Sequence, residues 1–273
     1  MFDISISPSN NEFFIKPGQS YLLAFDIINN SQTTLTLNSS IETWLPKDNK
    51  GEITYENAFA DPSISFSLNN SDLKLGQTFL AKPNEKKQLV LKIHTTTSTS
   101  LKDHYYTFFI TQLSPDQTTA KIGAHLIFST QEKQTASLSI KKFSASPLIK
   151  DSFFKPIIFS GTAYNNSSQY SKLTGKLIIS KNNLKIQEII ISPDVILGNY
   201  SRSIRCADKE ANIIPCAINP PFWPGKYTAT LTLNSQKPIE TQISFFVFPY
   251  TVFLVLGIIT AIILITMRIK LKK

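Results

Sequence analysis

The chain has 273 residues, of which 42% are apolar, and its formal net charge is +9. This charge is unevenly spread: residues 1–135 hold 11 lysines against 13 acidic residues, whereas residues 136–247 hold 13 lysines and arginines against 6 acidic residues. Nucleic acid is a poor fit as a partner, because no basic run interleaves with aromatic residues. The basic half suits anionic lipid or wall polymer, and equally a solvated surface without a specific partner.

The chain begins in a predicted strand rather than in an export signal. Met1–Ile6 has neither the basic region nor the apolar region that secretory leaders carry. Because features described below place the body outside the cytoplasm, we expect that a leader was removed or omitted. A tail-anchored protein with a cytosolic body is the alternative.

Apolar and polar residues alternate along much of the chain, which predicts β-strands. The pattern is clearest at Tyr227–Leu233, where apolar side chains fall on one face and threonines on the other. Leu89–Ile93 and Leu138–Ile140 repeat it. Tyr21–Ile28 and Tyr105–Ile110 are nearly continuous apolar runs, as central strands of a sandwich can be. The sequence shows no helical stripe before the C-terminal region.

Turn-forming residues separate these runs at short intervals. They are Pro17-Gly18, Asn29-Asn30-Ser31, Lys47–Gly51, Asn69–Ser71, Pro83-Asn84, Asn165–Ser168, Asn182-Asn183 and Pro224-Gly225. Short strands punctuated in this way predict an all-β fold of two tandem immunoglobulin-like β-sandwiches, at residues 1–135 and 136–245. We expect roughly eight strands in the first and seven in the second. The two join near the polar stretch Gln131–Thr135.

No set of residues with catalytic spacing is present. The sequence lacks a Gly-x-Ser-x-Gly elbow, a phosphate loop, a His-Glu-x-x-His pair and a dinucleotide fingerprint. We expect His94, His104 and His125 to be structural or surface residues. The sequence therefore predicts a protein that is not an enzyme, with no cofactor, no metal site and no evident small-molecule substrate.

The two cysteines are Cys206 and Cys216. A close pair of this kind in an exported domain predicts one disulfide, worth about 3 kcal/mol in the chain-entropy model. Two unpaired thiols are the alternative. A metal site is disfavoured, because all three histidines lie in the other half of the chain.

Three large aromatic residues are candidate partner contacts. Phe222 and Trp223 come just before the clearest predicted strand, and Trp44 lies near the Lys47–Gly51 turn. One interpretation is an aromatic contact for a partner or for the membrane interface. The other is that the rings cover the sandwich core.

The C-terminal region predicts a membrane-spanning helix. Phe245–Met267 holds 23 residues and no charged side chain, and about 20 apolar residues suffice to cross a bilayer as a helix. We place the transmembrane helix at residues 246–267, with Pro249 and Tyr250 at its start, where proline and an amphipathic ring are both tolerated. A buried core helix is the alternative.

Residues 268–273 form a predicted basic tail. Its four positive charges are Arg268, Lys270, Lys272 and Lys273, and no acidic residue accompanies them. The positive-inside rule then places the tail in the cytoplasm and the body outside a cell membrane that the chain crosses once.

The order of motifs resembles that of the WxL-interacting surface proteins of Gram-positive bacteria and, more loosely, fimbrial-chaperone-type immunoglobulin-like domains. Phe13–Ser20 resembles the family's strand and Pro-Gly-Gln turn, and Ile27–Ser31 its strand ending in asparagines. Asn49–Ala58 is similar to its Asn-Gly-x-Ile-x-Tyr-x-x-Ala segment, with a lysine between Asn and Gly. Pro224–Thr228 resembles the Pro-Gly-Lys-Tyr strand of its second domain.

The resemblance implies a non-enzymatic surface scaffold that binds cell-wall polymer or surface proteins. The chain departs from the family in lacking a leader and a glycine-rich strand where Tyr105–Thr111 runs, which leaves the particular ligands open. The alternative function is an accessory subunit of a membrane complex. Gly257 and Ala261 stand four residues apart in the predicted helix, a spacing that allows close helix packing.

Overall fold

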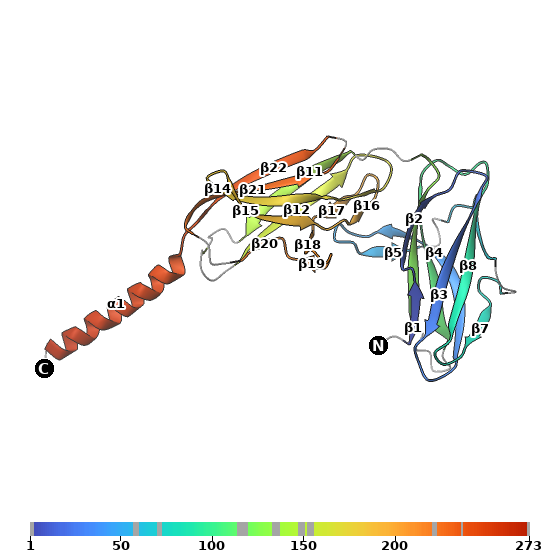
Figure 1. The fold of residues 1–273 in the computed structure, drawn as a ribbon, viewed down its shortest axis with the longest axis horizontal. Coiled ribbons are helices and arrows are strands. Elements are labelled where there is room, and N and C mark those ends of the chain that lie inside the picture. Colours follow the sequence, from blue (N-terminus) through green and yellow to red (C-terminus); the bar gives the residue numbers. More distant parts are fainter. Residues whose placement is uncertain are drawn as a thin grey trace. The chain divides into compact units, whose positions relative to one another are not determined.

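The computed structural model describes residues 3–56, 60–69, 73–113, 120–132, 137–146, 151, 156–219, 223–235 and 237–271. The chain divides into two compact units, Met1–Gln134 (unit 1) and Thr135–Lys273 (unit 2). The described residues form β-strands and one C-terminal helix (Figure 1). The predicted all-β fold with a single helix is therefore confirmed.

Unit 1 is a sandwich of two sheets. The first sheet has the strand order β1 (Ile4–Ser7), β3 (Ser20–Asn29), β8 (Lys86–Thr95), β6 (Ile64–Leu68). The second has the order β2 (Asn10–Phe14), β10 (Lys121–Ser129), β9 (Asp103–Leu113), β4 (Leu35–Pro46), β5 (Ile53–Tyr55), with β7 (Thr78–Ala81) also paired to β4. Since β1 pairs with β3 and β2 pairs in parallel with β10, the start of the chain crosses from one sheet to the other.

The core of unit 1 follows from the period-two pattern of its strands. On β9, Tyr106, Phe108 and Ile110 point inward and are buried. The ring of Phe108 lies 5.0 Å from the ring of Phe25 on β3, which joins the two sheets.

Unit 2 is a second sandwich. One sheet contains β11 (Leu138–Ser146), β12 (Ile157–Asn165), β17 (Ser201–Ser203) and β20 (Ala217–Ile218), and β13 (Ser171–Lys172) pairs with β16 (Val195–Ile196). The facing sheet has the order β19 (Ile213–Ile214), β18 (Cys206–Ala207), β15 (Leu184–Ile191), β14 (Gly175–Lys181), β21 (Gly225–Leu233), β22 (Ile239–Val247). The clearest predicted strand, Tyr227–Leu233, is within β21, and its apolar residues are buried.

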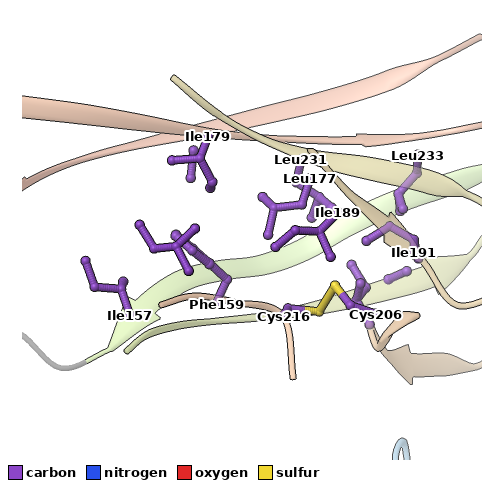
Figure 2. Packing of buried hydrophobic residues seen from close by; sticks show 14 of the residues in the cluster. Ile157, Phe159, Leu177, Ile179, Ile189, Ile191, Cys206, Cys216, Leu231 and Leu233 are labelled. Carbon is purple, nitrogen blue, oxygen red and sulfur yellow. A yellow bond between two sulfur atoms is a disulfide. The ribbon is translucent and has the colours of Figure 1, made fainter. Parts of the chain in front are cut away.

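Figure 2 shows how the two sheets of unit 2 meet. Leu231 on β21 and Leu177 and Ile179 on β14 pack in one buried cluster with Ile157 and Phe159 on β12. Isoleucine and leucine supply most of this core, and each fully buried side chain of this size contributes about 1.5–3 kcal/mol.

The strand count exceeds the prediction. Within the described ranges unit 1 has ten strands and unit 2 has twelve, against the eight and seven predicted. The excess in unit 2 lies mainly between residues 195 and 218, where β16 to β20 have two or three residues each. A strand of two residues is too short to show an alternating pattern in the sequence.

The two units share one turn motif. Asn29 ends β3 and is fully buried. Its side-chain amide donates to the carbonyls of Thr33 (2.8 Å), Ala81 (3.0 Å) and Lys82 (3.0 Å). Its Oδ1 accepts from the backbone N–H and the hydroxyl of Ser31.

Asn165 does the same in unit 2. It ends β12, is fully buried, and donates to the carbonyls of Gln169 (2.7 Å) and Ile196 (3.3 Å). Its Oδ1 accepts from the N–H and hydroxyl of Ser167. In each Asn-Asn-Ser turn, the asparagine therefore connects the end of a strand both to a carbonyl four residues later and to carbonyls far along the chain.

The helix α1 (Tyr250–Leu271) begins later than predicted. Phe246 and Val247, which we placed in the helix, belong to β22, and Val247 is buried in the sandwich. Pro249 follows, and its carbonyl accepts the N–H of Phe253 at 3.3 Å in the first turn. The strand continues to Val247 because this side chain packs in the core of the sandwich. Pro249 lies just before the first residue of the helix, where proline is tolerated.

The helix also extends into the predicted basic tail. The helix continues through Leu271, so the backbones of Arg268 and Lys270 lie in its last turn. Cations are favourable there, because the C-terminal end of a helix carries a partial negative charge. Lys272 and Lys273 lie outside the described residues.

Candidate binding surfaces

Trp44 lies on β4 and is only 7% exposed. Its indole N–H donates to the carbonyl of Tyr106 at 2.9 Å. Its ring lies 5.2 Å from that of Tyr105 and 5.5 Å from that of His125. These contacts favour the interpretation in which the ring covers the sandwich, because little of the indole is left for a partner.

The surroundings of Trp44 form a compact outer layer on the second sheet of unit 1. Thr107 is fully buried there and shares a 2.9 Å hydrogen bond with Nδ1 of His125. Burial lowers the pKa of His125 below its usual range. Gly123 permits this packing, since a Cβ at its position would lie 2.8 Å from the ring of Phe109 and 2.5 Å from Cγ2 of Thr107.

Trp223 has the opposite environment. It is 80% exposed and lies two residues before β21. Its backbone is fixed, because its carbonyl accepts the hydroxyl of Tyr227 at 2.5 Å. The ammonium of Lys181 donates to the next carbonyl, that of Pro224, at 2.9 Å. Phe222, the third predicted aromatic contact, lies outside the described residues.

Two contacts hold the first turn of α1. Asp151 is buried, and its carboxylate accepts both the N–H (3.2 Å) and the hydroxyl of Thr251. This places a negative charge at the positive end of the helix, which has no acidic residue in its own first turn. The rings of Phe248 and Phe253 stack with their centroids 5.1 Å apart.

An apolar groove of about 720 Å³ opens on the side of unit 2. Three isoleucines there are about half-exposed, namely Ile158 on β12, Ile190 on β15 and Ile213 on β19. Ile158 and Ile190 line this groove, and Ile158 and Ile213 line an adjoining hollow of about 380 Å³. The other residues of the groove are Pro156, Gln187, Glu188, Ile189, Ala207, Asp208, Lys209, Ile214, Pro215, Ala217 and Asn219.

Charged residues line this groove together with its apolar residues. Glu188 on its rim pairs with Lys185 at 3.3 Å and with Lys176 at 4.0 Å. Asp208 accepts the N–H groups of Glu210 and Asn212, and hydrogen bonds from Asn212 lower the pKa of its carboxyl. An apolar floor with a charged rim is the usual composition of a protein contact surface.

Among the described strands, parts of β10 and β15 are paired on one side only. On β10, the ladder with β2 begins at His125 and leaves Lys121–Ala124 paired on one side only. On β15, the ladder with β18 begins at Ile190 and leaves Leu184–Ile189 paired only with β14. An uncovered edge of this kind can accept a partner strand. The register with β14 shifts near Ile186, which makes the β15 edge the less regular of the two.

A disulfide joins Cys206 and Cys216, whose Cα atoms are 5.1 Å apart. Cys206 is in β18, which pairs with β15, and Cys216 immediately precedes β20, which pairs with β12. The bond therefore connects the two sheets of unit 2 beside the groove (Figure 2). Both cysteines are buried in the core cluster.

Replacing both cysteines with serine is expected to destabilise unit 2 by roughly 2 to 3 kcal/mol, because an 11-residue loop is released in the unfolded chain. Urea unfolding followed by hydrogen exchange in each unit measures this. Unit 1 provides the internal control, since the sequence has no cysteine there. Equal loss of protection in both units would contradict a local role for the bond.

The sequence contained a signal for the groove that the predictions did not use. Ile157-Ile158, Ile189-Ile190-Ile191 and Ile213-Ile214 are runs of adjacent isoleucines in strands. Because successive side chains of a strand point to opposite faces, one member of each run must face outward. Ile157 and Ile158 illustrate this, the first being fully buried and the second about half-exposed.

No family model and no curated protein matches the chain. Solved structures do match it. The Class 5 fimbriae chaperone CfaA has 15% identity and a TM-score of 0.43, over 90% of this chain and 99% of that one. The E. coli chaperone DraB has 9% identity and a TM-score of 0.41, over 89% and 98%. A chain of the Salmonella enterica SafA pilin–SafB chaperone complex has 9% identity and a TM-score of 0.42, over 89% and 97%. At these identities and TM-scores the likenesses assign no role to this chain.

Proposed function

We propose that this chain is a membrane-anchored, non-enzymatic surface protein of the WxL-interacting type, which presents two β-sandwiches to protein or cell-wall partners outside the cytoplasm. One observation carries the proposal. The helix α1 contains a 20-residue stretch, Tyr250–Ile269, with a mean hydropathy of 2.6, and none of it is buried. Beyond its first turn, this helix packs against none of the residues that the structure describes, and an apolar helix of this length then needs a lipid or protein environment.

The direction of insertion follows from charge. Arg268, Lys270, Lys272 and Lys273 end the chain, and the nearest basic residue before the helix is Lys237. The positive-inside rule therefore assigns the C-terminal end to the cytoplasm and both sandwiches to the outside. The oxidised Cys206–Cys216 pair suits an exported body, because disulfides persist mainly in oxidising compartments.

Partner binding is assigned to the groove of unit 2. Monomeric proteins rarely expose several large aliphatic side chains together unless they form a contact surface. Ile158 and Ile190 offer such a surface, and the disulfide connecting β18 to the segment before β20 holds the groove walls in place. The partner that fits is a protein that inserts apolar side chains between the charged rim residues.

The test is retention of the full chain, held in detergent micelles, on purified cell wall and on surface-protein extract. We expect retention to be lost when Ile158 and Ile190 are both replaced by serine. The matched control is Leu80→Ser, an exposed apolar residue of unit 1. If the double variant and the control were retained equally, the groove would not be the binding surface. If neither the wild type nor any variant were retained, the adhesion function would be wrong.

The second candidate function is an accessory subunit of a membrane complex. It is favoured by the open surface at Gly257, where, apart from the neighbouring residues and backbone of its own helix, no described atom lies within 4 Å of the position that a Cβ would take. This leaves the helix free for close approach by another helix. Loss of co-purifying membrane proteins in Gly257→Leu would support this function, and an unchanged set would exclude it.

A further inference from the structure

The end of unit 2 from which α1 leaves carries several exposed aromatic rings. We call this end the base and define it as Trp223–Lys226 and Phe246–Tyr250. The ladder between β21 and β22 pairs Gly225 with Val247 and Lys226 with Phe246. Continued by two residues, this register places Trp223 level with Pro249, one residue before the helix begins. Figure 1 shows α1 leaving unit 2 directly from β22.

The rings of the base are unusual in their exposure. Trp223 and Phe246 are the most exposed aromatic residues among the described part of the chain, and Phe248 and Phe253 are about half-exposed. The backbone at Trp223 is held in place by hydrogen bonds. Tyr227 and Lys181 hold the carbonyls of Trp223 and Pro224 by hydrogen bonds. The exposed indole is therefore attached to a backbone that these two hydrogen bonds fix.

Positive charge accompanies these rings. The ammonium of Lys181 lies at the Trp223 turn, bonded to the carbonyl of Pro224, and exposed Lys226 is paired across the ladder with Phe246. Tryptophan, tyrosine and lysine are the residues that favour the headgroup layer of a bilayer, since each combines an apolar body with a polar end.

We propose that the base is a second membrane contact, in which Trp223 and Phe248 lie in the headgroup layer of the bilayer that α1 crosses, with Lys181 and Lys226 facing lipid phosphates. This proposal rests on the proposed membrane anchor. The occupant is lipid rather than another protein, because the rings are level with the start of an apolar helix and continuous with it. The body of unit 2 would then rest on the membrane surface instead of standing clear of it.

The chain has two tryptophans, which makes a direct test available. The full chain is reconstituted into vesicles that contain anionic lipid and phosphatidylcholine brominated either near the headgroup or near the chain ends. In the Trp44→Phe variant, Trp223 is the remaining tryptophan. Bromine quenches tryptophan only at contact, so quenching in this variant reports whether Trp223 touches lipid. We expect shallow bromines to reduce its emission about twofold or more, and deep bromines to have a smaller effect.

A second variant protects the test against misfolding of Trp44→Phe. The lipid-quenched part of the wild-type emission should vanish in Trp223→Phe, which leaves Trp44 buried in unit 1. Flotation of the vesicles reports insertion of α1 separately. If the chain floats but Trp223 is quenched by aqueous iodide and not by brominated lipid, the base is not a membrane contact while the anchor stands. If the chain does not float, both proposals are wrong.

Discussion

Replacing Asn29 with alanine is expected to destabilise unit 1 by about 4 kcal/mol. The change removes three donated and two accepted hydrogen bonds. The buried carbonyl of Ala81 and the N–H of Ser31 each lose this partner, and a buried polar group left without one costs about 1–3 kcal/mol. The carbonyl of Lys82 keeps the N–H of Glu85. Urea unfolding at neutral pH measures the loss, with hydrogen exchange identifying the unit that opens.

The neighbouring asparagines serve as matched controls. Asn30→Ala removes a side chain that is exposed and should change the stability by less than about 0.5 kcal/mol. In unit 2, Asn165→Ala should repeat the large effect. Asn166→Ala should have a smaller effect, because the amide that it removes is exposed and donates only to the carbonyl of Ser137, at 3.2 Å. If both members of a pair behaved alike, the buried amide would not be what holds the turn.

Lowering the pH from 6.5 to 4 is expected to reduce the free energy of unfolding of unit 1 by about 3 kcal/mol, because His104 binds a proton more weakly in the folded state. His104 is buried, stacks on Phe128 with ring centroids 5.1 Å apart, and lies 3.4 Å from the hydroxyl of Thr130. Burial first, and the charge of Lys102 second, lower its pKa to about 4, against a smaller opposing effect of Asp61.

The sign follows from the unfolded chain, in which histidine has its ordinary pKa of about 6.5. Between the two pKa values the unfolded chain binds a proton that the folded chain does not, so stability is full above pH 6.5 and falls until pH 4. The His104→Phe variant keeps a ring over Phe128 and removes the titration. Its unfolding free energy should fall less over this range than that of the wild type, and parallel curves would refute the assignment.

The sequence allowed the strands and the helix to be predicted where the pattern was long. Tyr227–Leu233 and the C-terminal apolar run each extend over enough residues to show one periodicity. By contrast, β18 and β20 have two residues each, and only their pairing to β15 and β12 makes them strands. That pairing depends on contacts between distant residues, which no local pattern contains.

The candidate contacts show the same limit. Trp44 and Trp223 looked alike in sequence, since each lies near a turn. Trp44 is covered because β4 carries it against Tyr105 and His125 of neighbouring strands. Trp223 has no such cover because it precedes the last pair of strands at the end of the sandwich. Which ring is free was therefore decided by tertiary position and not by residue type.

The places where the chain enters and leaves unit 2 determine how this sandwich responds to force. The N–H of Leu138, at the start of β11, donates to Ser235 just beyond the end of β21. The chain leaves at the opposite end, through Val247 and the Asp151–Thr251 contact. Tension applied between Leu138 and α1 therefore runs along the strands of this sandwich. Since ladder hydrogen bonds lie across the strands, the nine residue pairs of β21 and β22 bear the load together in shear and do not unzip one by one.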